Sequence, residues 1–404
     1  MSYAIVDLEV TQPLPTLTIP PGKTGIALVV RCHDRPVGLL LKSLPAGAIA
    51  PGELADWIAR ELGAKLLQER IREEIAISTK PVDFPSLTVA ICTKDRPDYV
   101  QRLLRSLLPL QQNQDISRFE ILVVDNAPSN DRTQAVVSDF SNVGYIREPK
   151  AGLDFARNRA LQEATGELLA FLDDDVVVDR HWLSGLQEAW AENPDAAAFT
   201  GLVLPYELET EAQILFEQRG GFRRGFEKIR YGQILPNNVE YPCGSGIFGA
   251  GCNMAFRRDR LRAIGGFDDA LDTGAPLPGG GDIDIFYRII RAGYPLVYEP
   301  RYLVFHQHRR ELAQLRRQYW SWGLGVMAFV TKSYQDDSTQ RSKFLRLIAW
   351  WYKDKLGQLL RSFTKPQQIP PAMILAELWG GIVGLLGEYD RSRDRVQAIR
   401  RQYE

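Results

Sequence analysis

Aspartates that directly follow apolar segments are the residues of this 404-residue chain whose spacing most suggests chemistry. Asp95, Asp125 and the triplet Asp173-Asp174-Asp175 each stand just after one such segment. Carboxylates held close together repel one another unless a cation or hydrogen-bond donors lie among them. Their hard oxygens suit Mg²⁺ or Mn²⁺, and Mg²⁺ completes its coordination with water and substrate phosphate. The pattern therefore predicts a divalent metal and a diphosphate ligand.

A structural interpretation competes with this one, because an acid after a strand can simply cap the turn or helix that follows. It stays open for Asp95 and for Asp125. Three successive aspartates directly after an apolar strand favour a ligand site.

A glycine-rich loop at residues 278–281 leads into a helical pattern whose first turn carries Asp282 and Asp284. The helix dipole favours acids there, so capping is one account. The other account makes one of them a catalytic base at the end of a mobile loop. Gly251 lies in a second glycine-bearing segment, where backbone can approach a ligand closely.

His306 and His308 form an HxH pattern after another apolar run. On a strand this spacing points both imidazoles to the same side. The pair is either structural or, if the three acidic strand ends lie nearby, a source of metal ligands.

The elements that must position these residues are short strands alternating with helices over residues 86–310. We expect strands at 87–92, 119–124 and 168–172, and helices at 99–108 and 156–164. Such alternation predicts an α/β fold with a mostly parallel sheet covered by helices. Ligands of these sheets bind beyond the carboxyl ends of the strands, where the acids stand.

Two further regions flank this domain. Residues 1–80 are expected to form a small α+β accessory domain without chemistry of its own. Residues 311–404 are expected to form a basic, aromatic-rich helical extension with five of the eight tryptophans. Trp320 and Trp322 could stack on a ligand or lie in the core. Prolines, glycines and Glu377 interrupt the apolar stretch 369–386, so a spanning helix is not expected.

Composition and charge narrow the function classes. Apolar residues make up 45% and charged residues 25% of the chain, as in globular proteins. Residues 301–404 hold 18 Lys/Arg and 9 Asp/Glu, whereas residues 1–300 hold 31 and 41. The acidic body argues against nucleic-acid binding, and the basic end suggests an anionic partner such as a membrane surface.

The compartment is expected to be the cytoplasm. The four cysteines lack zinc-site spacing and suit a reducing environment. The first residues do not resemble a secretory signal peptide.

The order of the motifs resembles family 2 glycosyltransferases of the GT-A fold, which use nucleotide-diphosphate sugars and invert the anomeric centre. The resemblance covers about residues 86–310 and rests on seven short segments: 92–96, 123–126, 151–158, 171–175, 265–268, 281–284 and 305–309. It implies a transfer from a nucleotide-diphosphate sugar, most commonly a UDP-sugar, to a glycan or lipid-linked acceptor.

The resemblance also implies roles for individual residues. The nucleotide would contact Thr93, Asp95, Arg96, Asp125, Arg157 and Asp173. A divalent metal, Mn²⁺ or Mg²⁺, would be held by Asp173 and Asp175 of the DxD pair, with His306 or His308 near it. Asp282 would be the general base, and by the same analogy Asp284 would share its work. Gly251, Trp320 and Trp322 would lie on the acceptor side.

One departure from the family pattern is Gly281, which stands where the family has a glutamate before the base. It motivates a rival hypothesis, a catalytically silent nucleotide-sugar-binding or scaffold protein of a polysaccharide assembly system. A nucleotidyltransferase is a third hypothesis. It is disfavoured because residues 93–97 are not a glycine-rich basic phosphate loop.

Overall fold

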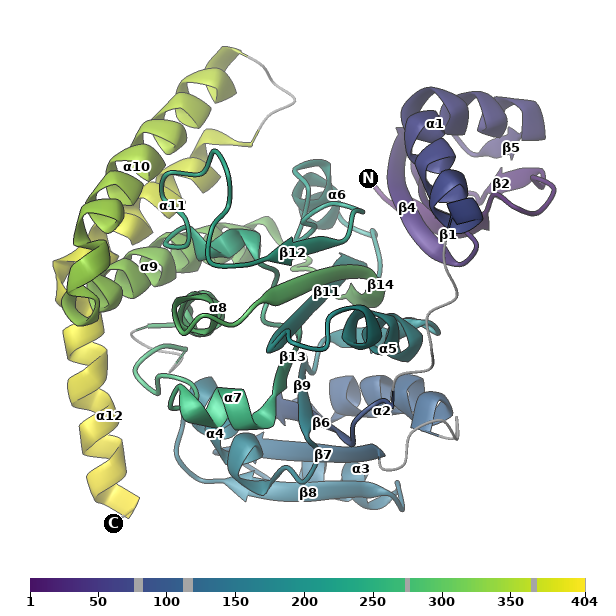
Figure 1. Ribbon diagram of the computed structural model, residues 1–404. Helices are drawn as coiled ribbons and strands as arrows, with labels where there is room; N and C mark the ends of the chain where they lie inside the picture. Colours follow the sequence, from purple (N-terminus) through teal and green to yellow (C-terminus); the bar gives the residue numbers. More distant parts are fainter. Residues whose placement is uncertain (76–82, 112–118, 273–276, 365–368, 404) are drawn as a thin grey trace.

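A mixed nine-stranded sheet forms the centre of the computed structural model, which describes residues 1–75, 83–111, 119–272, 277–364 and 369–403 (Figure 1). Its strand order is β10 (Val176–Val178), β14 (Leu296–His306), β11 (Ala198–Pro205), β13 (Asn253–Arg257), β9 (Leu168–Asp173), β6 (Leu87–Thr93), β7 (Phe119–Asn126) and β8 (Val143–Glu148), with β12 (Ile229–Tyr231) paired to β14.

The predicted α/β architecture is confirmed. Strand β6 pairs in parallel with β7 and β9, β7 with β8, and β11 with β14, whereas β13 runs antiparallel between β9 and β11. All residues of β6 are buried, as expected for a strand with both faces covered. The parallel trio β6, β7 and β9 therefore ends at one edge of the sheet.

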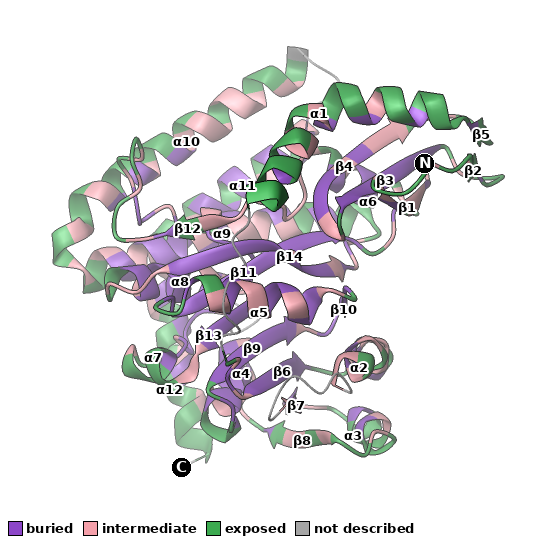
Figure 2. Cartoon of the chain, turned by 45° about the vertical axis from the view of Figure 1, so that its right-hand side comes forward, coloured by how far each residue is buried: buried purple, intermediate pink, exposed green. Residues whose placement is uncertain are grey.

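Helices cover both faces of this sheet (Figure 2). One core cluster joins the sheet to α4 (Leu153–Glu163), α7 (Arg258–Ala263) and α8 (Gly281–Arg291). The cluster on the other face joins it to α2 (Pro97–Gln111), α3 (Arg132–Ser138) and α5 (Trp182–Glu192). Two short helices, α6 (Glu211–Gln218) and η1 (Ser245–Ile247), precede β12 and β13 respectively.

The N-terminal residues form a separate small sheet with one long helix. Strand β3 (Gly25–Cys32) pairs in parallel with β1 (Tyr3–Glu9) and antiparallel with β4 (Arg35–Ser43). A two-stranded ribbon joins β2 (Leu17–Ile19) to β5 (Gly47–Ile49). Helix α1 (Pro51–Ile75) packs on this sheet through Leu54, Ile58 and Leu62, which are buried.

Buried ion pairs dock this N-terminal unit onto the central domain. Arg31 of β3 has no exposed surface and donates to Asp7 and, at 2.6 Å, to Asp179 Oδ2. Arg35 of β4 pairs with Glu188 of α5 and, at 3.0 Å, with the fully buried Glu299 of β14. Both arginines are therefore tied to the edge of the central sheet.

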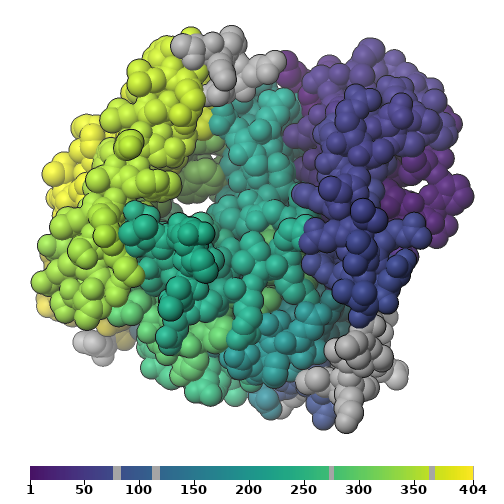
Figure 3. All heavy atoms as spheres, turned by 45° about the horizontal axis from the view of Figure 1, so that its top comes forward, coloured from purple at the N-terminus to yellow at the C-terminus, as the bar shows by residue number. Residues whose placement is uncertain are grey.

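The C-terminal part is helical and lies on the opposite side of the central domain from the N-terminal unit (Figure 3). Its elements are α9 (Leu312–Asp336), η2 (Ser338–Gln340), α10 (Arg341–Thr364), α11 (Pro371–Val383), η3 (Gly384–Glu388) and α12 (Tyr389–Tyr403).

Asp337, between α9 and η2, ties these helices to α8. It accepts hydrogen bonds from Tyr287 at 2.7 Å and from Arg291 at 2.8 Å. Burial by itself would raise the pKa of Asp337, but the hydrogen bonds from Arg291, Thr339 and Tyr287 outweigh it and lower this pKa to about 2.

One helical stretch of the described residues, Pro371–Tyr403, is long and apolar enough to cross a membrane by length and composition alone. Half of its most apolar window is buried against the rest of the protein. The stretch also breaks at Leu386 and Gly387, whose backbone angles are not helical. This is weak evidence for a membrane span, because core helices of soluble proteins pass the same test.

Candidate active site

The strand register brings the predicted acids together at one edge of the sheet. Thr93 at the end of β6 is level with Asp125 of β7, and Cys92 is level with Asp173 of β9. The three acidic strand ends thus lie side by side at one edge of the sheet, as the sequence predicted.

The three aspartates of the triplet point in different directions. Asp174 turns inward, where it accepts from Thr93 Oγ1 at 2.7 Å and from Arg96 Nη1 at 2.6 Å. Asp175 accepts from the same guanidinium at 3.2 Å and lies 3.3 Å from Nε2 of His306. Asp174 therefore fastens the loop after β6, whereas Asp175 faces the histidines.

The pKa values of Asp173 and Asp175 shift in opposite directions. Burial, with repulsion from Asp175 and Asp174, raises the pKa of Asp173. Burial would also raise the pKa of Asp175, but attraction to His306, with Arg96 and Arg309, outweighs it and lowers this pKa. Asp175 is thus the more strongly ionised member of the DxD pair, as a cation ligand needs to be.

Asp95 lies in the loop that follows β6, and Asp125 lies near the end of the neighbouring strand β7. Asp125 is fully buried and accepts from Tyr145 Oη at 2.9 Å through Oδ2, and burial raises its pKa. Its Oδ1 is buried with no hydrogen-bond partner among the described residues. Asp95 is exposed and accepts from the backbone N–H of Ser129 at 2.8 Å, which lowers its pKa.

Arg157 is the centre of a buried group of carboxylates. Its Nη1 donates to Asp154 Oδ1 and to Asp272 Oδ2, both at 3.0 Å, and its Nη2 lies 3.7 Å from Asp173. Burial would lower the pKa of Arg157, but these carboxylates raise it. Burial and mutual repulsion raise the pKa of Asp154 well above its ordinary value, and burial raises that of Asp272.

Asp282, the predicted base, is half-buried at the first turn of α8 beside this group. Its Oδ2 accepts from the backbone N–H of Gly251 at 3.1 Å, and its Oδ1 accepts from that of Ile283 at 2.8 Å. A Cβ at Gly251 would lie 2.9 Å from Asp282 Cβ and 3.2 Å from Arg157 Nη2. Glycine at 251 therefore leaves room for both side chains to approach the backbone at this position.

The departure at Gly281 has a structural explanation. A Cβ at this position would lie 2.7 Å from Asp272 Oδ2 and closer still to Asp154 Oδ2, distances that real Cβ contacts do not show. The space that a side chain at 281 would need is thus filled by carboxylates from two other segments. The acidic character beside Asp282 is retained although the glutamate is missing.

The structure is against the predicted catalytic role of Asp284. Its side chain has no exposed surface. It accepts from Arg288 Nε and from Lys332 Nζ, both at 2.7 Å. We therefore assign Asp284 a positioning role, in which it joins α8 to α9.

The two histidines form a buried relay behind Asp175. Their Nδ1 atoms are 2.9 Å apart, and His308 Nε2 lies 2.7 Å from Oε1 of Glu217, which also pairs with Arg223. A carboxylate only accepts hydrogen bonds, so each Nε2 carries a proton in this arrangement.

His308 is not placed to hold a metal. Both of its nitrogens are engaged, one by His306 and the other by Glu217, and burial lowers its pKa. The expectation for His308 is therefore corrected: it supports His306, whose Nε2 faces Asp175.

The donors present fit a metal site that the substrate completes. Among the described residues no cluster of three or more His, Cys, Asp or Glu side chains is preassembled to hold an ion. Asp175 supplies one donor, and Nε2 of His306, 3.3 Å from it, would supply a second after giving up its proton. Magnesium commonly takes one or two protein carboxylates and fills its shell with water and substrate phosphate, so this set suits an ion bridging to a diphosphate.

The two tryptophans of the predicted acceptor side lie in different surroundings. The ring of Trp322 packs on Phe216 and Phe222 with centroids 5.7 and 5.9 Å apart, and Phe222 packs on His306. Trp320 lies between α9 and α11, where it lines a groove. Trp322 is thus part of the packing around the histidines, and acceptor stacking stays a prediction.

Several residues of the site were not foreseen. Asp154 stands in the same short motif as Arg157 and could have been recognised by its (i, i+3) spacing on a helix. Asp272 and Glu217 carry no local sequence signal. Their importance comes only from contacts made across the fold.

Comparison with known proteins agrees with this geometry. The sequence model described as "Glycosyl transferase family 2" matches residues 88–265. The chain is 28% identical over 282 residues to the pre-mycofactocin glycosyltransferase of Mycobacterium tuberculosis, covering 68% of this chain and 54% of that one. It therefore spans about half the length of that relative.

In two other relatives the alignment covers a larger share of the relative's own length. The glucosyl-dolichyl phosphate glucuronosyltransferase of Haloferax volcanii is 24% identical over 314 residues, covering 74% of this chain and 96% of that one. The succinoglycan biosynthesis protein ExoM of Rhizobium meliloti is 28% identical over 240 residues, covering 57% and 71%.

Among solved structures, a mannosyltransferase from Pyrobaculum calidifontis in complex with GDP-Man and Mn²⁺ superposes with a TM-score of 0.48 at 17% identity, covering 82% of this chain and 97% of that one. The family match, the relatives and the acidic strand ends of the sheet agree: residues 88–265 of this chain form a domain of glycosyltransferase family 2.

Proposed function

We propose that this protein is an inverting glycosyltransferase that moves a sugar from a nucleotide-diphosphate sugar, expected to be a UDP-sugar, to a hydroxyl of a glycan or lipid-linked acceptor. The observation that carries the proposal is the grouping of Asp173, Arg157 and Asp282 at the carboxyl ends of the strands. An acid of the DxD pair, a buried arginine and a half-buried base are what such a transfer needs.

The nucleotide is expected beside the ends of β6 and β7. The unpartnered Oδ1 of Asp125 is a buried acceptor that a base N–H, such as that of uracil, would satisfy. A buried acceptor without a partner costs about 1–3 kcal/mol, so a ligand donor at this atom is favoured. Thr93 and Arg96 contribute indirectly, because they hold Asp174 and with it the turn that presents the DxD pair.

Asp282 acts as the base in this mechanism. The acceptor hydroxyl attacks C1 of the donor sugar from the face opposite the diphosphate, the C1–O bond to the diphosphate breaks, and Asp282 takes the hydroxyl proton. The N–H groups of Gly251 and Ile283 fix the orientation of the carboxylate. A well-placed base contributes about 10²–10⁴-fold to the rate.

Charge on the leaving group is met by cations. Arg157 is held in place by Asp154 and Asp272, so its position costs no reorganisation during the reaction. A divalent ion, Mn²⁺ or Mg²⁺, held by Asp175 and His306 would neutralise the charge that grows on the departing diphosphate.

The acceptor class and location are inferred from the C-terminal helices and the relatives. One relative is named as a glucosyl-dolichyl phosphate glucuronosyltransferase, and another as a succinoglycan biosynthesis protein. Large apolar side chains are exposed on the C-terminal helices: Leu345, Trp350, Leu356, Leu360, Phe363, Leu375, Trp379, Ile382, Leu385 and Leu386. We therefore expect a peripheral protein on the cytoplasmic face of an anionic membrane.

The test begins with thermal unfolding in the presence of UDP, GDP, dTDP or CDP, each with Mn²⁺ or with EDTA. One diphosphate should stabilise the protein, by about 2.7 kcal/mol at a hundredfold excess over Kd. EDTA and Asp175→Asn should abolish the effect, and the control Asp259→Asn, at an exposed site on α7, should keep it.

Turnover separates the enzyme from a silent binder. Incubation with the matching nucleotide sugar should release the diphosphate, and Asp282→Asn should keep binding while losing most of the release. Binding without release by the unmodified protein, with glycan and lipid acceptors supplied, would instead favour a scaffold role. No stabilisation by any nucleotide would contradict the proposal.

A further inference from the structure

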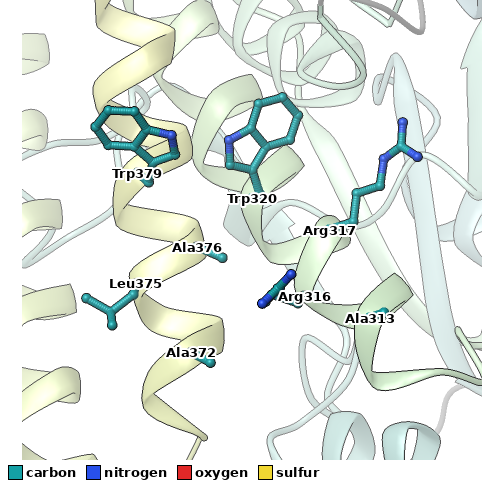
Figure 4. Close-up of a pocket in the computed structure, with 8 residues that line it drawn as sticks. All are labelled: Ala313, Arg316, Arg317, Trp320, Ala372, Leu375, Ala376 and Trp379. Carbon is teal, nitrogen blue, oxygen red and sulfur yellow. The ribbon is translucent and has the colours of Figure 1, made fainter.

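A groove of about 700 Å³ lies between α9 and α11 (Figure 4). Trp320 and Trp379 project from the two helices at one end of it, and Leu375 lies farther along α11. Three alanines complete the apolar lining, and Arg316 and Arg317 stand on the α9 side. The groove is therefore apolar with a cationic edge.

The groove follows from how the two helices touch. A Cβ at Gly323 would collide with the carbonyl oxygen of Glu377, and one at Gly380 with that of Trp320. The backbones are thus in direct contact at these glycines, and the helices run in the same direction. Toward their N-terminal ends the contact gives way to the alanine-lined groove.

The charge of the groove selects an anionic ligand. Arg316 and Arg317 are both exposed. Both helices also direct their N-terminal ends, which carry partial positive charge, toward the open end of the groove. An apolar cleft beside two guanidinium groups complements an amphiphile whose head is a phosphate or diphosphate.

Exposed apolar surface continues beyond the groove. Trp379 is 59% exposed, and the neighbouring helix α10 carries an exposed stripe of Leu345, Leu356, Leu360 and Phe363. Helix α10 is fastened to α11 by a 2.8 Å ion pair between Lys355 and Glu377. Such contiguous apolar surface marks an interaction site rather than an ordinary solvent face.

Helix α9 connects the groove to the catalytic loop. The carbonyl oxygen of Ser321, next to Trp320, lies 3.8 Å from the position of a Cβ at Gly279. The carbonyl oxygen of Gly325 lies 2.9 Å from such a position at Gly280, two residues before Asp282. Trp320 also packs on the cluster that contains Phe155 and Leu271, the neighbours of Asp154 and Asp272.

We propose that this groove binds the lipid end of the acceptor, with the hydrocarbon chain between Trp320 and Trp379 and the phosphate on Arg316 and Arg317. This inference rests on the proposed function and narrows the acceptor to a lipid-linked phosphate. Because the groove and the glycine loop share α9, an acceptor held here lies beside the segment that carries Asp282.

The test measures binding of farnesyl phosphate to the full chain by titration calorimetry, with farnesol and inorganic phosphate as separate arms. Farnesyl phosphate should bind more tightly than either fragment. The double variant Arg316→Ala/Arg317→Ala should weaken it about tenfold or more, as expected for loss of hydrogen bonds to a charged group. Trp379→Ala should weaken it to a similar extent through lost apolar burial. Trp350→Ala, another exposed tryptophan on α10, is the matched control and should bind normally.

The outcomes separate this inference from the proposed function. Nucleotide-diphosphate stabilisation should be unchanged in the groove variants, because they leave the strand ends intact. If farnesyl phosphate binds and no nucleotide does, the proposed function fails while the groove stands. If Trp379→Ala and the double arginine variant bind farnesyl phosphate as the unmodified protein does, the groove inference is overturned. It is equally overturned if the protein binds phosphatidylglycerol vesicles but not farnesyl phosphate.

Discussion

Replacement of Gly281 by alanine tests the arrangement of the carboxylates beneath the base. The added Cβ would lie 2.7 Å from Asp272 Oδ2 and closer still to Asp154 Oδ2, whereas ordinary van der Waals contact begins near 3.4 Å. Asp272 must therefore move by about 0.7 Å and Asp154 by more. Overpacking of this kind costs about 1–3 kcal/mol, although alanine is the better helix former by about 1 kcal/mol.

Turnover should suffer more than stability. Asp154 and Asp272 hold Arg157 at 3.0 Å, so a shift of either carboxylate displaces the guanidinium beside the leaving group. A misplacement of about 1 Å can cost about 10²-fold in rate. We expect Gly281→Ala to lower kcat by up to that factor with a smaller change in KM.

The measurements are urea unfolding and release of diphosphate from the nucleotide sugar. Gly279→Ala is the matched control in the same loop, because its nearest neighbours would lie at 3.7 and 3.8 Å. Its stability should stay within about 0.5 kcal/mol of the unmodified protein. Gly281→Glu, which restores the residue typical of the family, should be worse than alanine. If Gly281→Ala behaved like Gly279→Ala in both assays, Asp154 and Asp272 would not lie where this reasoning needs them.

Three further predictions concern the rest of the fold. The pKa of Asp337, lowered to about 2, contributes stability that is present above the unfolded value near 4 and is lost as the pH falls toward 2. In urea titrations, Asp337→Asn should therefore lower the free energy of unfolding by about 2 kcal/mol at pH 7 and by clearly less at pH 3. An equal loss at both pH values would contradict this prediction. Arg31→Met leaves the buried Asp179 without its ion pair and should destabilise the protein by about 3–5 kcal/mol. The control Arg180→Ala, which removes an exposed ion pair, should cost less than about 1 kcal/mol. Similar melting temperatures for the two variants would refute the docking role of Arg31. Glu217→Gln should weaken the Mn²⁺ dependence of nucleotide binding about 10–100-fold, since Glu217 supports His306 only through His308; an unchanged Mn²⁺ titration would count against the relay.

The parts of the site that sequence alone could predict are those fixed by strand ends. An apolar run followed by acids sets both the strand and the edge at which its acids appear, so Asp125 and the DxD pair follow from pattern and parallel pairing. The helix that begins at Gly281 was equally readable, because a glycine loop, two acids and an apolar period stand together.

The parts that could not be predicted depend on contacts between distant segments. Arg157 and Asp272 are 115 residues apart, and His308 and Glu217 are 91 apart. Asp284 looked like a partner of the base in sequence, yet Lys332, 48 residues later, draws it into the core. Periodicity and local spacing carry no information about such pairs.

The glycine contact between α9 and α11 bears on where the folded unit ends. Deletion of α11 would uncover Leu324, Met327 and Ala328 of α9, all of which are fully buried. Helix α9, which contacts the glycine loop, would then lose the helix that packs against it. A shortened protein lacking these helices is then expected to lose the proposed membrane binding and the proposed turnover together, because its fold fails and not because recognition does. The folded unit is thus expected to extend well past residue 265, where the family match stops. Substitutions of single exposed side chains, and not deletions, can therefore separate recognition from folding.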